Sequence, residues 1–247
     1  MPYLDNIITV VIPVYNSEKT LLHVISHIPE FVDNLIIVDD CSTDKSYNLI
    51  QDLPINHIRH SINKGYGGCQ KTCYLEALKS NAEIIAMIHP DDQHNPRELE
   101  NLIRHMIEGH YDLVIGTRFT NKYSPVIYGM PYYKYYGNLF LTKVVNLFLG
   151  TKLSDAHSGY RVFSRKLLLS LPFYKNANDF EFDAQIIIQA INSNYSISNS
   201  IVSVHYPQDC SSISFYNSLI YGVNTIKNLV LYKLHDWRII KSNILTI

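Results

Sequence analysis

The stretch Glu83–Glu100, which reads EIIAMIHPDDQHNPRELE, joins an apolar run to a polar turn and then to a new helix. The run Ile84–Ile88 contains no polar residue, as is typical of a strand inside a parallel sheet whose two faces are both covered. Pro90 biases His89 towards an extended backbone, and the polar residues Asp91 and Asp92 that follow at once end the strand in a turn. Asn95 is a good N-cap and Pro96 suits the first position of a helix. The stretch therefore predicts a strand, a turn and a helix in direct succession.

The turn carries five side chains that can bind a metal or a substrate or transfer a proton: His89, Asp91, Asp92, Gln93 and His94. Open α/β sheets bind their ligands at the carboxyl ends of the strands, which is where this turn lies. Carboxylate and amide oxygens suit Mg²⁺ or Mn²⁺ held jointly with substrate phosphates. The alternative is a solvated turn whose acids stabilise the following helix N-terminus.

The same alternation recurs through the first half of the chain. Apolar runs of strand length occur at residues 7–14, 35–38 and 113–115, with polar turns and helical spacing between them, and residues 55–59 could form a further short strand. Regular alternation of strands and helices predicts an α/β fold with a doubly wound, mostly parallel sheet and helices on both faces. Its functional loops should then share one edge.

Composition bounds the function. The chain has 247 residues, 47% hydrophobic and 17% charged, with a formal net charge of -1, which gives no reason to expect nucleic acid as a partner. Its first residues lack a secretory signal, and no window reaches the ~20 apolar residues of a membrane span. We expect a cytoplasmic protein whose membrane contact, if any, is peripheral and on the inner face.

The second half is less regular. Tyr132–Leu149 has the spacing of a helix, and Ser154–Arg165 concentrates an acid, an imidazole, a glycine and two arginines in one turn. A helix near Asp179 carries Glu181 and Asp183 at its start, where the helix dipole favours carboxylates. These two acids therefore serve either helix stability or catalysis.

The C-terminal segment from Ser211 to Trp237 also has helical spacing, with too many polar residues for a membrane span. It can pack on the core, join two subunits of a homodimer, or lie in a membrane interface. We divide the chain into a domain of residues 1–210, with a nucleotide-sugar-binding half (1–120) and an acceptor half (121–210), and a C-terminal helical segment (211–247).

Six motifs in this order and at these intervals carry a family resemblance: VVIPVYNSE, IIVDDCSTD, NKGYGG, HPDDQHNP, DLVIGTRF and DAHSGYRVFSR. Together they resemble the family 2 glycosyltransferases of GT-A fold. The most similar branch is that of dolichyl-phosphate mannose synthases and bacterial polysaccharide-biosynthesis transferases. The resemblance covers residues 7 to about 221, most of the chain.

The resemblance implies roles for particular residues. The metal ligands it implies are Asp91 and Gln93, with His89 in the place of the first Asp of the commoner D-x-D pattern. Histidine ligates Mn²⁺ but is a poorer ligand for Mg²⁺. The candidate general bases are Asp155, Glu181 and Asp183. The nucleotide and donor contacts are Pro13, Tyr15, Glu18, Asp40, Lys64, Gly65, Asp91, Arg118 and Arg161.

The implied function is metal-assisted, inverting transfer of one sugar from a UDP-, GDP- or dTDP-linked donor. The acceptor would be a glycan, a polyprenyl phosphate or a glycolipid that serves the cell envelope. A hydroxyl acceptor needs a general base, whereas a polyprenyl phosphate arrives already ionised. The alternative is a non-catalytic sugar-nucleotide-binding or scaffold protein that keeps the fold, which the replacement at His89 favours.

Overall fold

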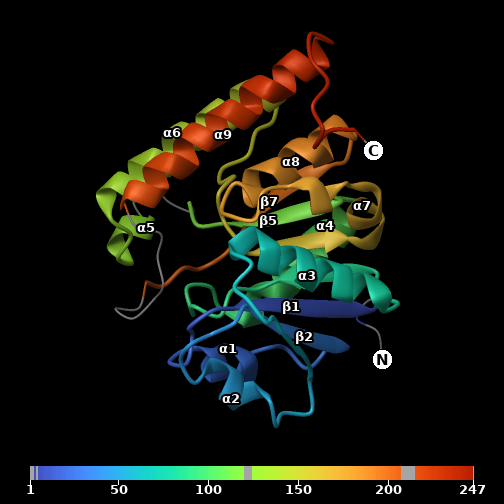
Figure 1. Ribbon diagram of the computed structural model, residues 1–247, viewed down its shortest axis with the longest axis vertical. Helices are drawn as coiled ribbons and strands as arrows, with labels where there is room; N and C mark the ends of the chain where they lie inside the picture. The colour runs from blue at the N-terminus through green and yellow to red at the C-terminus, as the bar shows by residue number, and fades with distance from the viewer. Residues whose placement is uncertain (1–2, 4, 120–123, 207–214, 247) are drawn as a thin grey trace.

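The computed structural model describes residues 3, 5–119, 124–206 and 215–246 and contains one sheet in the order β3-β2-β1-β4-β6-β5-β7 (Figure 1). The strands are β1 (Ile8–Val14), β2 (Asn34–Asp39), β3 (Asn56–Arg59), β4 (Ile84–Met87), β5 (Leu113–Thr117), β6 (Arg161–Ser164) and β7 (Ile197–Ile201). The α-helices are α1 (Leu21–Ser26), α2 (Ser46–Ile50), α3 (Tyr66–Lys79), α4 (Leu99–Glu108), α5 (Ser124–Ile127), α6 (Tyr132–Leu149), α7 (Arg165–Ser170), α8 (Phe182–Asn192) and α9 (Phe215–Asp236). Two 3₁₀ turns, η1 (Pro96–Glu98) and η2 (Phe173–Lys175), complete the elements of the described residues.

The strand register confirms the mostly parallel sheet. β1 pairs in parallel with β2 and with β4, so that Val10 lies between Leu35 and Ala86. β6 is antiparallel to both of its neighbours, β4 and β5. The carboxyl ends of β1, β2 and β4 therefore meet at one edge, as the alternation of strands and helices predicts.

Helices cover both faces of the sheet, because alternate residues of each strand point to opposite sides. Val11 of β1 belongs to a hydrophobic cluster with α3, α7 and α8, whereas Val10 and Ile12 belong to a second cluster with α1, α2 and α4. Burial of both faces explains why β1 is apolar at every position except Thr9 rather than alternating.

The helix α9 packs on the core, which is one of the three options that its sequence leaves open. It contacts α6 and α8, and it buries Thr225, Leu229 and Tyr232. Its other side is exposed and apolar, with Tyr216 70% exposed. None of the helices in the described ranges is long and apolar enough to cross a membrane.

The predicted division into domains stays a prediction. Its inner boundary at residues 120 and 121 and its outer boundary at residues 210 and 211 lie outside the described residues.

Candidate active site

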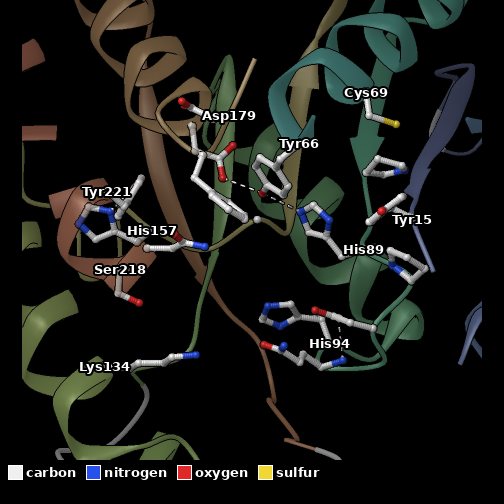
Figure 2. Close-up of a pocket in the computed structure, with 18 of the residues that line it drawn as sticks. Tyr15, Tyr66, Cys69, His89, His94, Lys134, His157, Asp179, Ser218 and Tyr221 are labelled. Carbon is white, nitrogen blue, oxygen red and sulfur yellow. Dashed lines mark hydrogen bonds between the residues drawn. The ribbon is translucent and has the colours of Figure 1, made fainter. Parts of the chain in front are cut away.

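A cleft of about 810 Å³ opens where the turns after β1, β2 and β4 face the first turns of α6 and α9 (Figure 2). We call its two sides the strand wall and the helix wall. The strand wall consists of Pro13, Tyr15, Asp40, Gly65, His89, Asp91 and Gln93. The helix wall consists of Lys134, Asn138, Ser218 and Tyr221, with His157 beside them. The expectation that the functional loops share one edge is therefore met on the strand wall.

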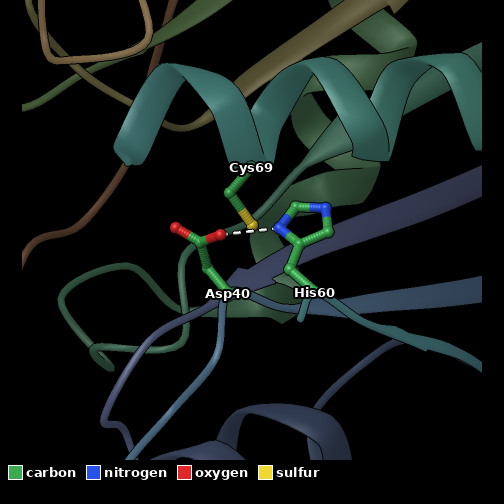
Figure 3. A group of neighbouring side chains, drawn as sticks. All are labelled: Asp40, His60 and Cys69. Carbon is green, nitrogen blue, oxygen red and sulfur yellow. Dashed lines mark hydrogen bonds and ion pairs between the residues drawn. The ribbon is translucent and has the colours of Figure 1, made fainter. Parts of the chain in front are cut away.

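Asp40 is held rigidly at the end of β2 (Figure 3). Its Oδ1 accepts a hydrogen bond from the backbone N–H of Lys64 at 2.8 Å, and its Oδ2 accepts one from Gly65 at 2.9 Å. The Nδ1 of His60 lies 2.6 Å from Oδ1, and the Asp40 side chain is almost completely buried. Because three donors converge on this carboxylate, it is fixed before any ligand arrives.

Asp40, His60 and Cys69 form a group of three potential metal ligands within 4.8 Å of one another. Such a nitrogen and sulfur set suits Zn²⁺ better than Mg²⁺ or Mn²⁺. Each ligand has another partner in the protein, however, since His60 Nε2 lies 2.9 Å from Thr72 Oγ1 and the Cys69 thiol donates to Val38 O at 3.4 Å. We interpret the group as hydrogen-bonded support for Asp40.

The residues after β1 divide between the cleft and the surface. Pro13 and Tyr15 line the cleft, and their contacts with the nucleotide stay a prediction. Glu18 does not, because its carboxylate accepts a hydrogen bond from the backbone N–H of Lys45 at 2.9 Å. Glu18 thus links the turns after β1 and β2, and its contact with the donor stays a prediction.

Backbone amides of the glycine loop before α3 donate hydrogen bonds to other parts of the protein. Gly67 and Gly68 donate to the carbonyl of Asn178 at 2.8 and 3.2 Å, and Lys64 and Gly65 donate to Asp40. Gly65 lines the cleft with φ +82°, and a Cβ there would lie 2.6 Å from Asn178 O. The loop thus shapes the cleft, and these four amides are already hydrogen-bonded within the protein.

The acidic turn after β4 separates its two carboxylates. Asp91 lines the cleft and accepts a hydrogen bond from Gln93 N at 3.1 Å. Asp92, with φ +58°, turns away, and its Oδ1 lies 3.6 Å from His23 Nε2. Burial raises the pKa of Asp91, a cost that a bound cation would offset. Asp91 and Gln93 thus bring oxygen ligands to the cleft.

His89 is oriented by a hydrogen-bonded chain that sequence reasoning missed. The hydroxyl of Tyr66 donates to Asp183 Oδ2 at 2.8 Å and lies 3.2 Å from His89 Nε2 (Figure 2). Since the Tyr66 proton is directed at the carboxylate, His89 Nε2–H must be the donor to the Tyr66 oxygen. Burial lowers the pKa of His89, so the ring is neutral at pH 7 and Nδ1 keeps its lone pair.

Gly159 makes this arrangement possible. A Cβ at Gly159 would lie 2.2 Å from His89 Nε2 and 3.4 Å from the Tyr66 hydroxyl. No other residue fits here without displacing the imidazole. The glycine of the DAHSGYR motif is therefore required by the turn after β4, which is 70 residues earlier in the chain.

Arg118 and Asp155 form a buried, bidentate ion pair. Arg118 Nε donates to Asp155 Oδ2 at 2.7 Å, and a second guanidinium nitrogen donates to Oδ1 at 3.1 Å. Burial acts to raise the pKa of Asp155, but the charge and hydrogen bonds of Arg118, together with smaller contributions from His157, lower it overall. Arg118 lines the cleft, whereas Asp155 is fully buried behind it. Asp155 is thus paired with Arg118 and has no exposed surface, and its role as a general base stays a prediction.

Arg161 corrects the expectation of a donor contact. Its side chain is fully buried, and its guanidinium contacts the carboxylate of Asp183 at 3.2 Å and donates to Ser158 O at 2.9 Å. The reason is topological, because β6 lies between β4 and β5 and so carries Arg161 into the middle of the sheet. Arg161 supports Asp183 from behind.

The other two candidate bases are also engaged. Asp183 lines the cleft, but it accepts hydrogen bonds from Tyr66 and Gln70 besides its contact with Arg161. Glu181 accepts hydrogen bonds from the side chains of Asn224 and Asn228 of α9 and lies outside the cleft lining.

The helix wall contains residues that the sequence did not single out. His157 Nδ1 lies 2.7 Å from the hydroxyl of Tyr221, while its Nε2 has no hydrogen-bond partner among the described residues. Burial lowers the pKa of His157 to about 4, so it is neutral at pH 7. Lys134 and Asp179 also line the cleft. His157 lies within a quoted motif, but Lys134 and Tyr221 lie in helical patterns that carry no signal for a site.

The family model for glycosyl transferase family 2 matches residues 9–171, which include both acidic turns. The chain belongs to glycosyl transferase family 2. This confirms the family resemblance and makes the chain a glycosyltransferase.

Two relatives are similar to this transferase along most of its chain. UDP-N-acetylglucosamine–dolichyl-phosphate N-acetylglucosaminyltransferase of Methanococcus voltae is 29% identical over 222 residues, covering 83% of this chain and 88% of the relative. The low-salt glycan biosynthesis hexosyltransferase Agl6 of Haloferax volcanii is 28% identical over 204 residues, covering 80% of this chain but 48% of the relative.

The fold also matches a solved structure. Glucosyl-3-phosphoglycerate synthase of Mycobacterium tuberculosis, in complex with Mn²⁺, uridine diphosphate and phosphoglyceric acid, superposes with a TM-score of 0.69. The match covers 93% of this chain and 79% of that protein at 18% identity. This likeness confirms the GT-A fold of the transferase.

Proposed function

We propose that the transferase moves one sugar, with inversion, from a UDP-sugar to a polyprenyl phosphate at the cytoplasmic face of a membrane. The observation that carries the choice of acceptor is the engagement of Asp155, Glu181 and Asp183 by protein partners. None of these three carboxylates is placed to take a proton from an acceptor hydroxyl. A phosphate acceptor needs no such base, because it is ionised before it attacks.

The strand wall fits a divalent cation. Asp91 and Gln93 offer hard oxygen ligands, and His89 offers the lone pair of Nδ1, a set that suits Mn²⁺ and, with more oxygen ligands from substrate, Mg²⁺. When bound, the cation would neutralise negative charge on the departing diphosphate. The fixed carboxylate of Asp40 and the ring of Tyr15 would then hold the base and ribose.

The helix wall fits the acceptor phosphate. Lys134 brings a cation to the cleft, and His157 offers an Nε2 without a described partner. The first turns of α6 and α9 add the positive ends of two helix dipoles. The name of the Methanococcus voltae relative includes both UDP-N-acetylglucosamine and dolichyl phosphate. The Mycobacterium tuberculosis structure is a complex with uridine diphosphate. These names support the choice of UDP and of a lipid phosphate.

A hydroxyl acceptor is the second candidate, and one residue favours it. Asp179 lines the cleft and is exposed, and it lies on the same loop as Phe180. Its Oδ1 accepts a hydrogen bond from Glu181 N at 2.9 Å. If the acceptor were a glycan hydroxyl, Asp179 would be the carboxylate with access to it.

Two acceptors that differ only in the phosphate, a short-chain polyprenyl phosphate and the corresponding polyprenol, separate these candidates. With UDP-sugars and Mn²⁺, mass spectrometry should detect glycosylated polyprenyl phosphate and no glycosylated polyprenol. Asp179→Asn should keep the rate within about threefold, because no base is needed. Transfer to hydroxyl acceptors alone, with a loss of about 10² to 10⁴ in Asp179→Asn, would overturn the phosphate assignment.

A further inference from the structure

The helices α6 and α9 lie side by side and run in the same direction along one edge of the molecule (Figure 1). Their starts meet where the rings of Tyr133 and Phe215 are 5.1 Å apart. Farther along, a Cβ at Gly222 would lie 3.5 Å from Leu141. Each helix thus uses one side for the partner helix and the core, and leaves another side to the outside.

The outward sides are apolar, which is the reverse of what water favours. On α6 the exposed residues recur at intervals of three or four, and Leu147 is 79% exposed. On α9 they do the same, and Tyr216 is 70% exposed. We call the two stripes together the α6/α9 face: Tyr132, Tyr136, Phe140 and Leu147 on α6, with Tyr216, Ile220, Val223, Val230 and Trp237 on or just after α9.

The charged side chains of α6 and α9 are lysines, apart from one aspartate at the end of α9. Lys143 lies within the α6 stripe and Lys227 within the α9 stripe, and both are exposed. The sequence of α6 contains no acidic residue, and that of α9 contains only Asp236, at its last position, 3.8 Å from Lys233 Nζ. An aromatic and apolar face with interspersed lysines complements a surface that is apolar below and anionic above.

The α6/α9 face is also continuous with the cleft. Tyr133 and Lys134 on α6, and Ser218 on α9, line the cleft from the same first turns in which the stripes begin. A molecule lying on this face would therefore extend to the side of the cleft where we place the acceptor.

We propose that the α6/α9 face docks on an anionic lipid bilayer, with its aromatic side chains among the headgroups. This inference deepens the proposed function, on which it rests for the choice of a lipid occupant, because it names the surface that would present the acceptor. A second copy of the chain fits less well. It would bring the lysine-bearing stripes of two copies together with no carboxylate on the stripes to pair with them.

Flotation with vesicles tests the docking directly and without donor or acceptor. The full chain should float with phosphatidylcholine vesicles that contain phosphatidylglycerol, and much less with phosphatidylcholine alone. The double variant Phe140→Gln/Val223→Gln should reduce the floated fraction at least about fivefold, and Lys143→Glu/Lys227→Glu should abolish the preference for anionic lipid. Leu169→Gln is the matched control, since Leu169 is 61% exposed on α7, away from this face.

Failure of docking can be told apart from failure of the proposed function. Phe140 and Val223 do not line the cleft, so the double variant should still glycosylate a short-chain polyprenyl phosphate in vesicle-free solution. Absence of flotation of the unmodified chain, or equal flotation of Phe140→Gln/Val223→Gln, would overturn the proposal. So would a dimer in light scattering that the same double variant converts to a monomer, because a second copy would then cover the face.

Discussion

The Asp-Asp turn after β2 and the Asp-Asp turn after β4 start from the same sequence pattern and reach different states. In each pair one acid faces the cleft, Asp40 in the first and Asp91 in the second. The other acid, Asp39 or Asp92, turns away toward a basic side chain. The pattern thus fixes which edge the acids reach but not what they do there.

The difference lies in the partners of the two acids that face the cleft. Asp40 has donors from Lys64, Gly65 and His60 and is closed to further ligands on those sides. Asp91 accepts from Gln93 within its own turn, and burial raises its pKa. A carboxylate already surrounded by donors is a rigid template, whereas a partly buried carboxylate with few donors is a site for a cation.

The largest effect should come from Asp40→Asn, which disrupts the hydrogen-bonded turn after β2. Asp40→Asn puts an amide N–H₂ against groups that are themselves donors, and it leaves buried partners unsatisfied. We expect the free energy of unfolding to fall by about 2 to 4 kcal/mol in urea titrations. Nucleotide binding should be lost with and without metal. Asp52→Asn, on the exposed surface, is the control and should change stability by less than about 0.5 kcal/mol. An Asp40→Asn protein as stable as the parent would contradict the proposed difference between Asp40 and Asp91.

An intermediate effect on stability should come from His94, whose imidazole lies beside the turn after β4. Burial, aided by the charge of Arg118, lowers the pKa of His94 to about 3, and its Nδ1 has no partner among the described residues. The ordinary pKa of histidine is about 6.5, so between these values the unfolded chain binds the extra proton and stability falls as pH falls.

His94→Gln removes this acid sensitivity. The loss of unfolding free energy between pH 7 and pH 4.5 should be smaller in the variant by about 2 kcal/mol, measured by urea titration at both pH values. His110→Gln, at an exposed histidine, should keep the pH dependence of the parent. Parallel pH profiles for the parent and His94→Gln would show that His94 titrates normally.

The smallest effect, and one of opposite sign, should come from Asp91→Asn. Because the pKa of Asp91 is raised in the folded state, its ionisation at neutral pH costs stability. Without metal, the variant should be slightly more stable than the parent at pH 7, and the gain should disappear as pH falls through the pKa of Asp91. Thermal unfolding at pH 7 with a chelator measures it, and a clearly destabilised variant would mean that the turn after β4 is as closed as the turn after β2.

Much of the strand wall could be predicted from the sequence. Apolar runs followed by polar turns recur along the chain, and parallel strands bring their carboxyl ends to one edge of the sheet. Pro13, Tyr15, Asp40 and Asp91 could therefore be assigned to that edge without coordinates. These residues are positioned by local elements whose periodicity is visible in the chain.

The rest depends on contacts between distant residues. The chain from Asp183 through Tyr66 to His89 joins positions 117 and 23 residues apart, and no local pattern marks it. Arg161 looks like a phosphate ligand until the insertion of β6 between β4 and β5 is known. Helical spacing identifies α6 and α9, but apolar residues occur on several sides of each, so the spacing does not show which side packs.

The most direct test of the cation site in the turn after β4 is calorimetric titration of UDP. The titration uses the parent and Asp91→Asn, each with Mn²⁺ and then with a chelator. GDP and dTDP serve as comparison bases. For the parent, UDP should bind at least about tenfold more tightly with Mn²⁺ than with chelator, a difference of about 1.4 kcal/mol or more. For Asp91→Asn, the two affinities should be equal and weak. Metal-independent binding by the parent, or a full Mn²⁺ effect in Asp91→Asn, would contradict the assignment of the cation site to the turn after β4.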